Sequence, residues 1–132
     1  MIYLDSNIFI YACLNSQDVG EKSRRLLKEV ELGKTEAASS ALSFDEITWA
    51  VKKYRSLEQS MAAGDAFVNM PELVILPVDE STLRISLDLM RRYAFDPRDC
   101  IHAASAILCK ADALVSADSH FDILEEIPRK LP

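Results

Sequence analysis

Short apolar segments typical of β-strands alternate with longer segments of helical periodicity along the 132 residues of this sequence. The strand segments are residues 1–4, 35–39, 73–76 and 113–116, and the tail near Ile127 can add an edge strand. Between them, apolar residues recur with the helical period, which predicts helices over residues 7–14, 19–31, 43–54, 57–69, 79–92 and 97–110. This alternation predicts an α/β fold, a three-layer sandwich in which a parallel sheet is flanked by helices.

Length and composition predict one compact domain that spans residues 1–132 and has a substantial core. No apolar run reaches the roughly 20 residues that a membrane helix needs. The short apolar stretch at residues 2–4 has no basic segment before it, so we expect neither a membrane span nor a secretory signal. The three cysteines form no CxxC pair and are expected to be small buried side chains in a reducing cytoplasm.

The net charge of −6 argues against a protein that coats nucleic acid nonspecifically, because that mode of binding depends on positive charge. This net charge is still compatible with an enzyme that acts on nucleic acid, because cations bound in an acidic active site would offset part of the negative charge. The basic residues fall into groups at 24–28, 52–55 and 91–98, and most are expected to be solvated helix faces.

Four acidic residues fall at predicted junctions between strands and helices: Asp5, Glu46, Asp99 and Asp118. Sites in open parallel sheets form beyond the carboxyl ends of the strands, so the fold would bring these acids to one edge. Two unit charges about 4 Å apart interact by roughly 4 kcal/mol at an effective dielectric near 20. Converging carboxylates must therefore protonate, separate or bind a cation.

Each acid also has an ordinary structural explanation. Asp5 can cap the helix that follows it, and Asp118 can cap the short turn after it. Asp99 can interact with the positive N-terminal end of its helix, and Glu46 can complete a capping box that Ser43 begins. As a set, the acids predict a metal site. Because they offer only oxygen ligands, without the Cys/His spacing of zinc, the metal is expected to be Mg²⁺ or Mn²⁺.

Small polar residues stand beside the acids. Ser6, Asn7 and Ser116 are expected to orient the carboxylates through hydrogen bonds. His102 lies one helical turn after Asp99 on the same face, where it can contact substrate or be a half-buried, hydrogen-bonded residue.

Other patterns predict packing and exposure. Residues 73–76 form a continuous apolar run, which predicts a buried strand. In the helix 79–92, Leu83, Leu87 and Met90 are expected to face the core, whereas His120 is expected at the surface.

The four acidic segments, taken in order, resemble the motifs of the PIN domain family, and most closely its small prokaryotic members of the VapC toxin type. The segments that carry the resemblance are Leu4–Asn7, Ser43–Glu46, Asp99–Ala104 and Ser116–Phe121. The resemblance covers nearly the whole chain, and every acid of the family has a counterpart here. It implies a central parallel sheet of about five strands between helices.

The resemblance also implies a function. The expected activity is that of an endoribonuclease, the toxin of a toxin–antitoxin pair, which hydrolyses RNA phosphodiester bonds with Mg²⁺ or Mn²⁺. Asp5, Asp99 and Asp118 are then the expected metal ligands, and Glu46 binds a metal through water or positions the attacking water. The expected partners are RNA, a second copy of the chain in a homodimer, and a small antitoxin that covers the acidic groove.

Two alternatives remain open. A phosphohydrolase of the haloacid-dehalogenase type also begins with an Asp after its first strand. That family has a second Asp two residues later, however, where this chain has Asn7. The other alternative is a non-catalytic PIN-like module that holds RNA or a protein partner. The presence of all four acids disfavours it, because an anionic cleft repels phosphate.

Overall fold

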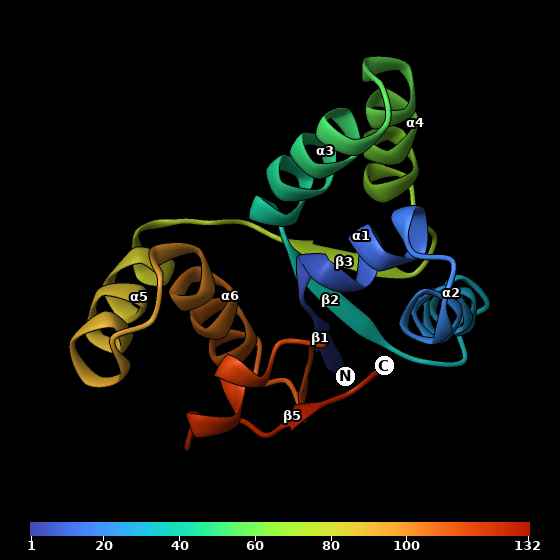
Figure 1. Ribbon diagram of the computed structural model, residues 1–132. Helices are drawn as coiled ribbons and strands as arrows, with labels where there is room; N and C mark the ends of the chain where they lie inside the picture. Colours follow the sequence, from blue (N-terminus) through green and yellow to red (C-terminus); the bar gives the residue numbers. More distant parts are fainter.

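The computed structural model describes residues 1–132 and shows a five-stranded parallel sheet with helices on both faces (Figure 1). The strands are β1 (Ile2–Leu4), β2 (Ala37–Ser40), β3 (Leu73–Leu76), β4 (Leu114–Val115) and β5 (Arg129–Lys130). The helices are α1 (Ser6–Leu14), α2 (Asp18–Glu31), α3 (Leu42–Tyr54), α4 (Leu57–Val68), α5 (Glu80–Tyr93), α6 (Pro97–Leu108) and the 3-10 helix η1 (Ser119–Ile123). The α/β fold predicted from the alternation is confirmed. None of these helices is both long and apolar enough to cross a membrane.

The strand order, β3-β2-β1-β4-β5, places β1 in the centre of the sheet. Tyr3 of β1 pairs with Ala38 of β2 on one side and with Leu114 of β4 on the other, and both pairings are parallel. Strands β2 and β3 therefore lie on one side of β1, and the later strands β4 and β5 lie on the other side. The crevice beyond the carboxyl ends of β1 and β4 is the topological switch point, where open α/β sheets bind ligands.

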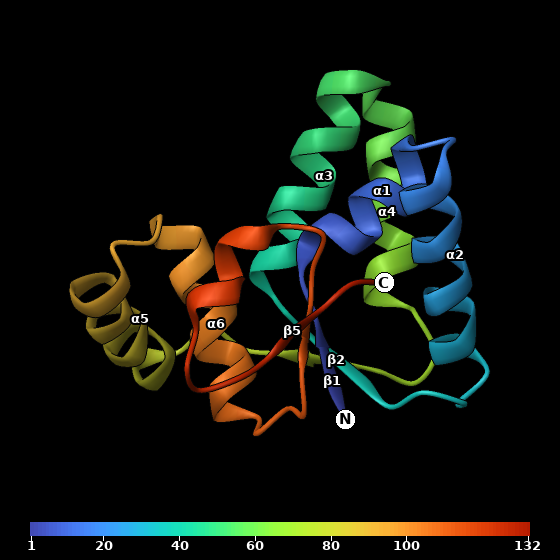
Figure 2. The same cartoon turned by 60° about the horizontal axis from the view of Figure 1, so that its bottom comes forward.

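Two hydrophobic cores lie on opposite faces of the sheet. Tyr3 and Leu114 belong to the core that α5 and α6 cover, whereas Leu4 and Val115 belong to the core that α1 to α4 cover. This follows from the strand period, because successive side chains point to opposite faces. Figure 2 shows α5 and α6 on one side of the strands and α1 to α4 on the other.

The predicted inner face of α5 is wrong. The three residues expected to point inward, Leu83, Leu87 and Met90, are 52%, 48% and 37% exposed. The helix instead buries Thr82, Ser86 and Leu89. The single hydroxyl proton of Ser86 is shared between the backbone oxygens of Thr82, at 2.7 Å from Oγ, and of Cys100 in α6, at 3.3 Å. Small side chains thus let α5 pack closely on α6 and leave the larger apolar residues outside.

The prediction that residues 73–76 form a buried strand is also wrong in part. They form β3, but β3 pairs only with β2 and is an edge of the sheet. Val74 is consequently 49% exposed, and the other residues of the strand are half-buried.

Candidate metal centre

Asp5 follows β1 directly and is the N-cap residue of α1, but its side chain does not cap the helix. Its carboxylate instead faces the switch point. Oδ2 accepts a hydrogen bond from Ser116 Oγ at 2.7 Å, and Oδ1 accepts one from Ser6 Oγ at 3.3 Å. Asp5 is only 5% exposed, and this burial raises the pKa of its carboxyl group. The capping explanation of Asp5 is therefore wrong, and another group must compensate its buried charge.

Glu46 reaches the same crevice from α3. The predicted capping box is wrong, because α3 begins at Leu42 and no side chain caps it. Ser43 lies inside the first turn, and its hydroxyl forms a hydrogen bond of 2.8 Å with the Ser39 hydroxyl of β2. Glu46 is left free to point inward, where its Oε1 accepts a hydrogen bond from Nε2 of His102.

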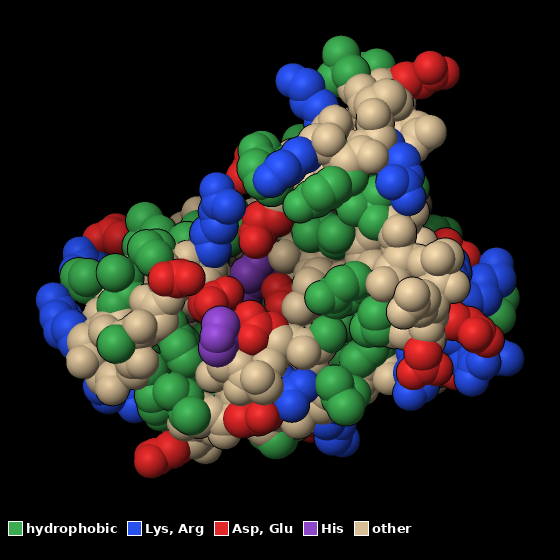
Figure 3. All heavy atoms as spheres, viewed as in Figure 1, with side chains coloured by type: hydrophobic (Ala, Val, Ile, Leu, Met, Phe, Trp, Pro, Cys, Tyr) green, Lys and Arg blue, Asp and Glu red, His purple; other side chains and the backbone are tan.

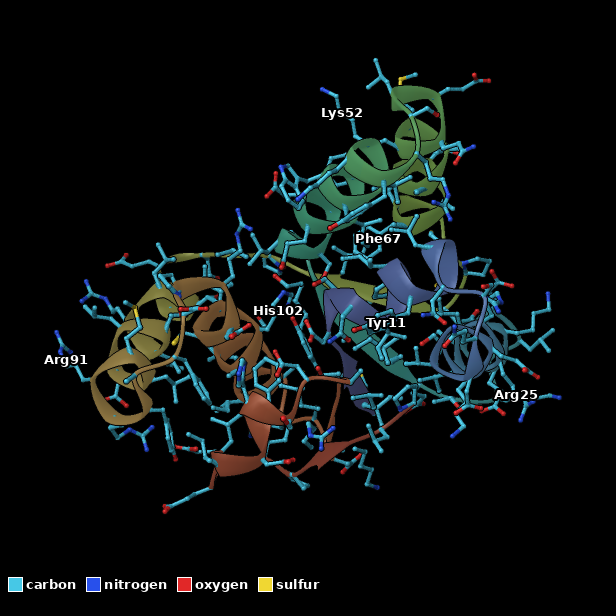
Figure 4. The ribbon with its side chains drawn as sticks, in the orientation of Figure 1. Tyr11, Arg25, Lys52, Phe67, Arg91 and His102 are labelled. Carbon is cyan, nitrogen blue, oxygen red and sulfur yellow. The ribbon has the colours of Figure 1, made fainter.

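His102 of α6 lies near the centre of the molecule, between α6 and α1 (Figure 4). It is 1% exposed, so it is buried rather than half-buried and offers no surface for substrate. Besides its bond to Glu46, Nε2 lies 3.7 Å from Asp5 Oδ1, and Nδ1 forms a hydrogen bond of 2.7 Å with the Tyr3 hydroxyl. Burial lowers the pKa of His102, but the bond to Glu46 and the charges of Asp5, Glu46 and Asp99 outweigh it and raise the pKa. His102 thus links two carboxylates.

Asp99, Asp118 and His120 form a second group, with ligand atoms that all lie within 4.8 Å of one another. Asp118 also caps η1, as predicted, by accepting a hydrogen bond of 2.9 Å from the backbone N–H of His120. The His120 ring is exposed, as predicted, yet its Nδ1 lies 3.1 Å from Asp118 Oδ1. Burial, followed by the charges of Asp5 and Asp118, raises the pKa of Asp99 to about 6.

Ser116 connects the two groups. Its buried hydroxyl donates to Asp5 and accepts hydrogen bonds of 3.0 Å from Asn7 Nδ2 and from the backbone N–H of Asp118. All three bonding positions of the hydroxyl are therefore used, and its rotation is fixed. The predicted orienting residues Ser6, Asn7 and Ser116 all contact the centre in this way.

The donor set fits a hard divalent cation. Carboxylate oxygens converge here, and the amide Oδ1 of Asn7 is buried without a hydrogen-bond partner. Buried polar atoms without a partner are rare and call for an unseen one such as water or an ion. Carboxylate and amide oxygens are the donors that Mg²⁺ and Mn²⁺ prefer. Figure 3 shows acidic side chains gathered around the histidines in a hollow of this face.

Two of the predicted ligands, Asp99 and Asp118, lie close to a residue outside the predicted set, His120. Ligand atoms of these three residues all lie within 4.8 Å of one another, which is close enough for a shared ion. Asp5, the first acid in the prediction, binds Ser116 and lies beside His102, although its charge acts on Asp99. Sequence reasoning missed His120 as a candidate ligand. The available signal was its position two residues after Asp118, where a cap residue brings the following turn close.

The raised pKa values predict that the metal-free protein is more stable at about pH 5.5 than at about pH 8. Asp5, Asp99 and His102 each bind a proton more tightly in the folded state, so their contribution is present at low pH. It is lost as the pH rises through their folded pKa values, about 6 for Asp99. Acids with lowered pKa values, such as Asp79 and Asp112, titrate below this window.

Urea unfolding in the presence of EDTA at both pH values measures this difference. The Asp99→Asn variant should show a smaller difference than the parent protein, because its amide does not titrate. Equal or greater stability of the metal-free protein at the higher pH would contradict the electrostatic picture of the centre.

The sequence profile of the PIN domain matches residues 2–127, and comparison with curated proteins gives no match. One similar structure is VapBC2 from Rickettsia felis bound to a DNA fragment from their promoter, with 21% identity and a TM-score of 0.76, covering 99% of this chain and 98% of that chain. A toxin–antitoxin complex from Klebsiella pneumoniae has 18% identity and a TM-score of 0.69, covering 96% and 95%.

A third similar structure is VapC20 from Mycobacterium tuberculosis, a sarcin-ricin loop cleaving toxin, with 11% identity and a TM-score of 0.80 over 96% of this chain and 97% of that chain. At such low identity these similarities show a shared fold, with nearly complete coverage of both chains. The sequence profile is the independent evidence, since it spans all strands but β5 and includes every acid of the centre. The chain belongs to the PIN domain family.

Proposed function

We propose that this protein is a metal-dependent endoribonuclease. The observation that carries the proposal is the meeting of four acids from separate elements at the switch point of the sheet. Asp5 and Glu46 are linked through buried His102, and Asp99 and Asp118 lie close together beside them. Neither acid of the first pair serves as a helix cap, so helix capping does not account for their placement. Function at a ligand site is the better explanation.

We assign different roles to the residues of the centre. Asp99, Asp118 and His120, with Asp5 beside them, would hold the cation. A bound divalent cation supplies charge neutralisation and activation of water for phosphodiester hydrolysis. Glu46 is fixed by His102 through Oε1, which leaves Oε2 to orient the attacking water. Ser116 holds Asp5 and the backbone of Asp118 in place.

We further propose that the protein is the toxin of a toxin–antitoxin pair. A groove with a volume of about 560 Å³ runs between α3 and α4. The apolar residues that line this α3–α4 groove are Phe44, Trp49, Leu57, Met61 and Val68. Trp49 and Met61 are 59% and 61% exposed, and together with the other apolar residues of the groove they form the kind of exposed apolar patch that commonly marks a protein-binding surface. The apolar groove supports a protein partner, and the Klebsiella pneumoniae relative is a toxin–antitoxin complex.

A homodimer is the second proposed assembly. Its support is the exposed face of α5, where Leu83, Leu87 and Met90 form one apolar stripe. This stripe lies on the opposite side of the sheet from the α3–α4 groove, so a second copy and an antitoxin can bind together. The two proposed interfaces therefore do not overlap.

The test of the proposed function compares substrates. Purified protein is incubated with mixed RNA or with p-nitrophenyl phosphate, with Mg²⁺, Mn²⁺ or EDTA. A nuclease cleaves RNA only with metal and leaves the nitrophenyl ester intact. Preferred hydrolysis of the ester would indicate a phosphohydrolase instead. Binding of RNA without cleavage under all conditions would indicate a binding module.

Metal binding is expected to raise stability measurably. At a hundredfold excess of Mn²⁺ over its dissociation constant, an ion that binds only the folded state adds about 2.7 kcal/mol to the free energy of unfolding. Thermal unfolding with and without millimolar Mn²⁺ measures the shift. The Asp45→Asn variant is the matched control and should show the same shift as the parent protein, because Asp45 is an exposed acid in the first turn of α3. An unchanged melting temperature in the parent protein would contradict the metal site.

A further inference from the structure

A second cavity, of about 470 Å³, adjoins the metal centre between the start of α6 and η1. Its volume lies in the range of small-molecule sites, roughly 300–1,000 Å³. Asp99 and His120 line this cavity and also belong to the candidate metal centre. Anything bound in the cavity would therefore touch the reacting region directly.

Four hydrophobic residues line the cavity: Tyr93, Ala94, Phe95 and Ile123. Phe95 stacks on Tyr93 with ring centroids 5.5 Å apart and meets Phe121 edge-to-face at 5.9 Å, so its position is fixed. Ile123 lines the cavity from η1 and is 57% exposed, and the exposed ring of His120 lies nearby on the same element. Unstacked RNA bases bind to such aromatic and apolar surfaces.

Asp96 is exposed and is one of the polar residues that line the cavity, together with Asp99, Ser119 and His120. It is the N-cap residue of α6, a position where Asp ordinarily accepts a hydrogen bond from the helix backbone, yet its side chain makes no such bond. It lines the cavity with both carboxylate oxygens available, and it is close enough to Asp99 for its charge to act there. An ionised carboxylate only accepts hydrogen bonds. A ligand that fits Asp96 must therefore present donors.

We propose that this cavity binds the base of a nucleotide flanking the cleaved bond and that Asp96 makes it prefer guanine. Guanine presents two adjacent donors on its Watson–Crick edge, N1–H and N2–H, which match the two oxygens of one carboxylate. Adenine and cytosine present an amino donor next to an acceptor nitrogen, and uracil presents one donor between two acceptors. Each of these would place an acceptor against Asp96. This inference rests on the proposed nuclease function, since it assigns the base to the substrate.

The experiment uses the full chain with Mn²⁺ and a single-stranded RNA of randomised sequence. The ends of the products are sequenced, which gives the base frequencies on both sides of the cleaved bond. Guanine should be enriched at one flanking position, and Asp96→Asn should reduce this enrichment by roughly tenfold, the discrimination expected of a paired hydrogen-bond contact. Asp45→Asn, at an exposed acid of α3 outside the cavity, should leave the enrichment unchanged.

A binding measurement without metal provides a second readout. Guanosine, adenosine, cytidine and uridine are titrated separately, and the NMR shift of the Ile123 methyl group is followed. Guanosine should bind most tightly to the parent protein, and Asp96→Asn should remove its advantage. Equal binding of the four nucleosides, or a base distribution that Asp96→Asn leaves intact, would overturn the guanine assignment while the nuclease activity stands. Absence of any RNA cleavage by the parent protein would instead refute the proposed function itself.

Discussion

Asp99→Asn is expected to reduce RNA cleavage roughly a thousandfold or more, since loss of one metal contact removes several kcal/mol of stabilisation. Asparagine has the same shape but no charge, so it is a poor partner for a divalent ion. The fold should persist. Asp99 is half-buried, and burial together with the charges of Asp5 and Asp118 raises its pKa to about 6, so the ionised carboxylate is unfavourable without metal. The neutral amide relieves this repulsion.

Cleavage rates and urea unfolding, measured on the same preparation, separate the two effects. Asp5→Asn should lose cleavage in the same way, whereas Asp45→Asn, at an exposed acid of α3, should keep the parent rate. If Asp99→Asn or Asp5→Asn unfolds and cannot be refolded, the acids are structural and the assignment of the centre is wrong. If both fold and cleave RNA at the parent rate, the centre lies elsewhere.

The convergence of the acids was predictable because it depends on topology alone. Asp5 and Asp118 follow the adjacent strands β1 and β4, and Asp99 begins a helix that packs against the same sheet. Parallel strands with right-handed crossovers bring such positions to one edge, whatever the side chains between them. The pairing partners were not predictable in this way. Whether Asp5 caps α1 or binds Ser116 depends on a rotamer that only the packed crevice selects.

The error on α5 has a related cause. Periodicity shows that a helix has an apolar face, but it does not show what that face meets. On α5 the small residues Thr82 and Ser86 are buried, and most buried residues of α6 are also small: Cys100, Ala103, Ala104, Ser105 and Ala106. The helices pack closely through these small residues, and this packing is favoured over burial of the leucines of α5. The leucine face is then left for a partner, which is why the same error supports the proposed homodimer.

The second large prediction compares the two histidines of the chain, because His102 is buried and His120 is exposed. His102→Ala is expected to lower the free energy of unfolding by about 3–5 kcal/mol, the usual cost of removing one partner from a buried ion pair. The variant would leave the Tyr3 hydroxyl, Asp5 and Glu46 without their shared partner and open a cavity at a site that is 1% exposed. Two carboxylates would then face each other with nothing positive between them.

His120→Ala is the matched control, since the His120 side chain is 72% exposed and its ion-pair partner is Asp118, at 3.1 Å. Its unfolding free energy should stay within about 0.5 kcal/mol of the parent value, while the stabilisation by Mn²⁺ should weaken. Urea unfolding with EDTA and with Mn²⁺ measures both quantities for both variants. A stable His102→Ala protein would mean that Asp5 and Glu46 do not need a positive partner in the apo fold. The buried network would then lose its role in assembling the centre.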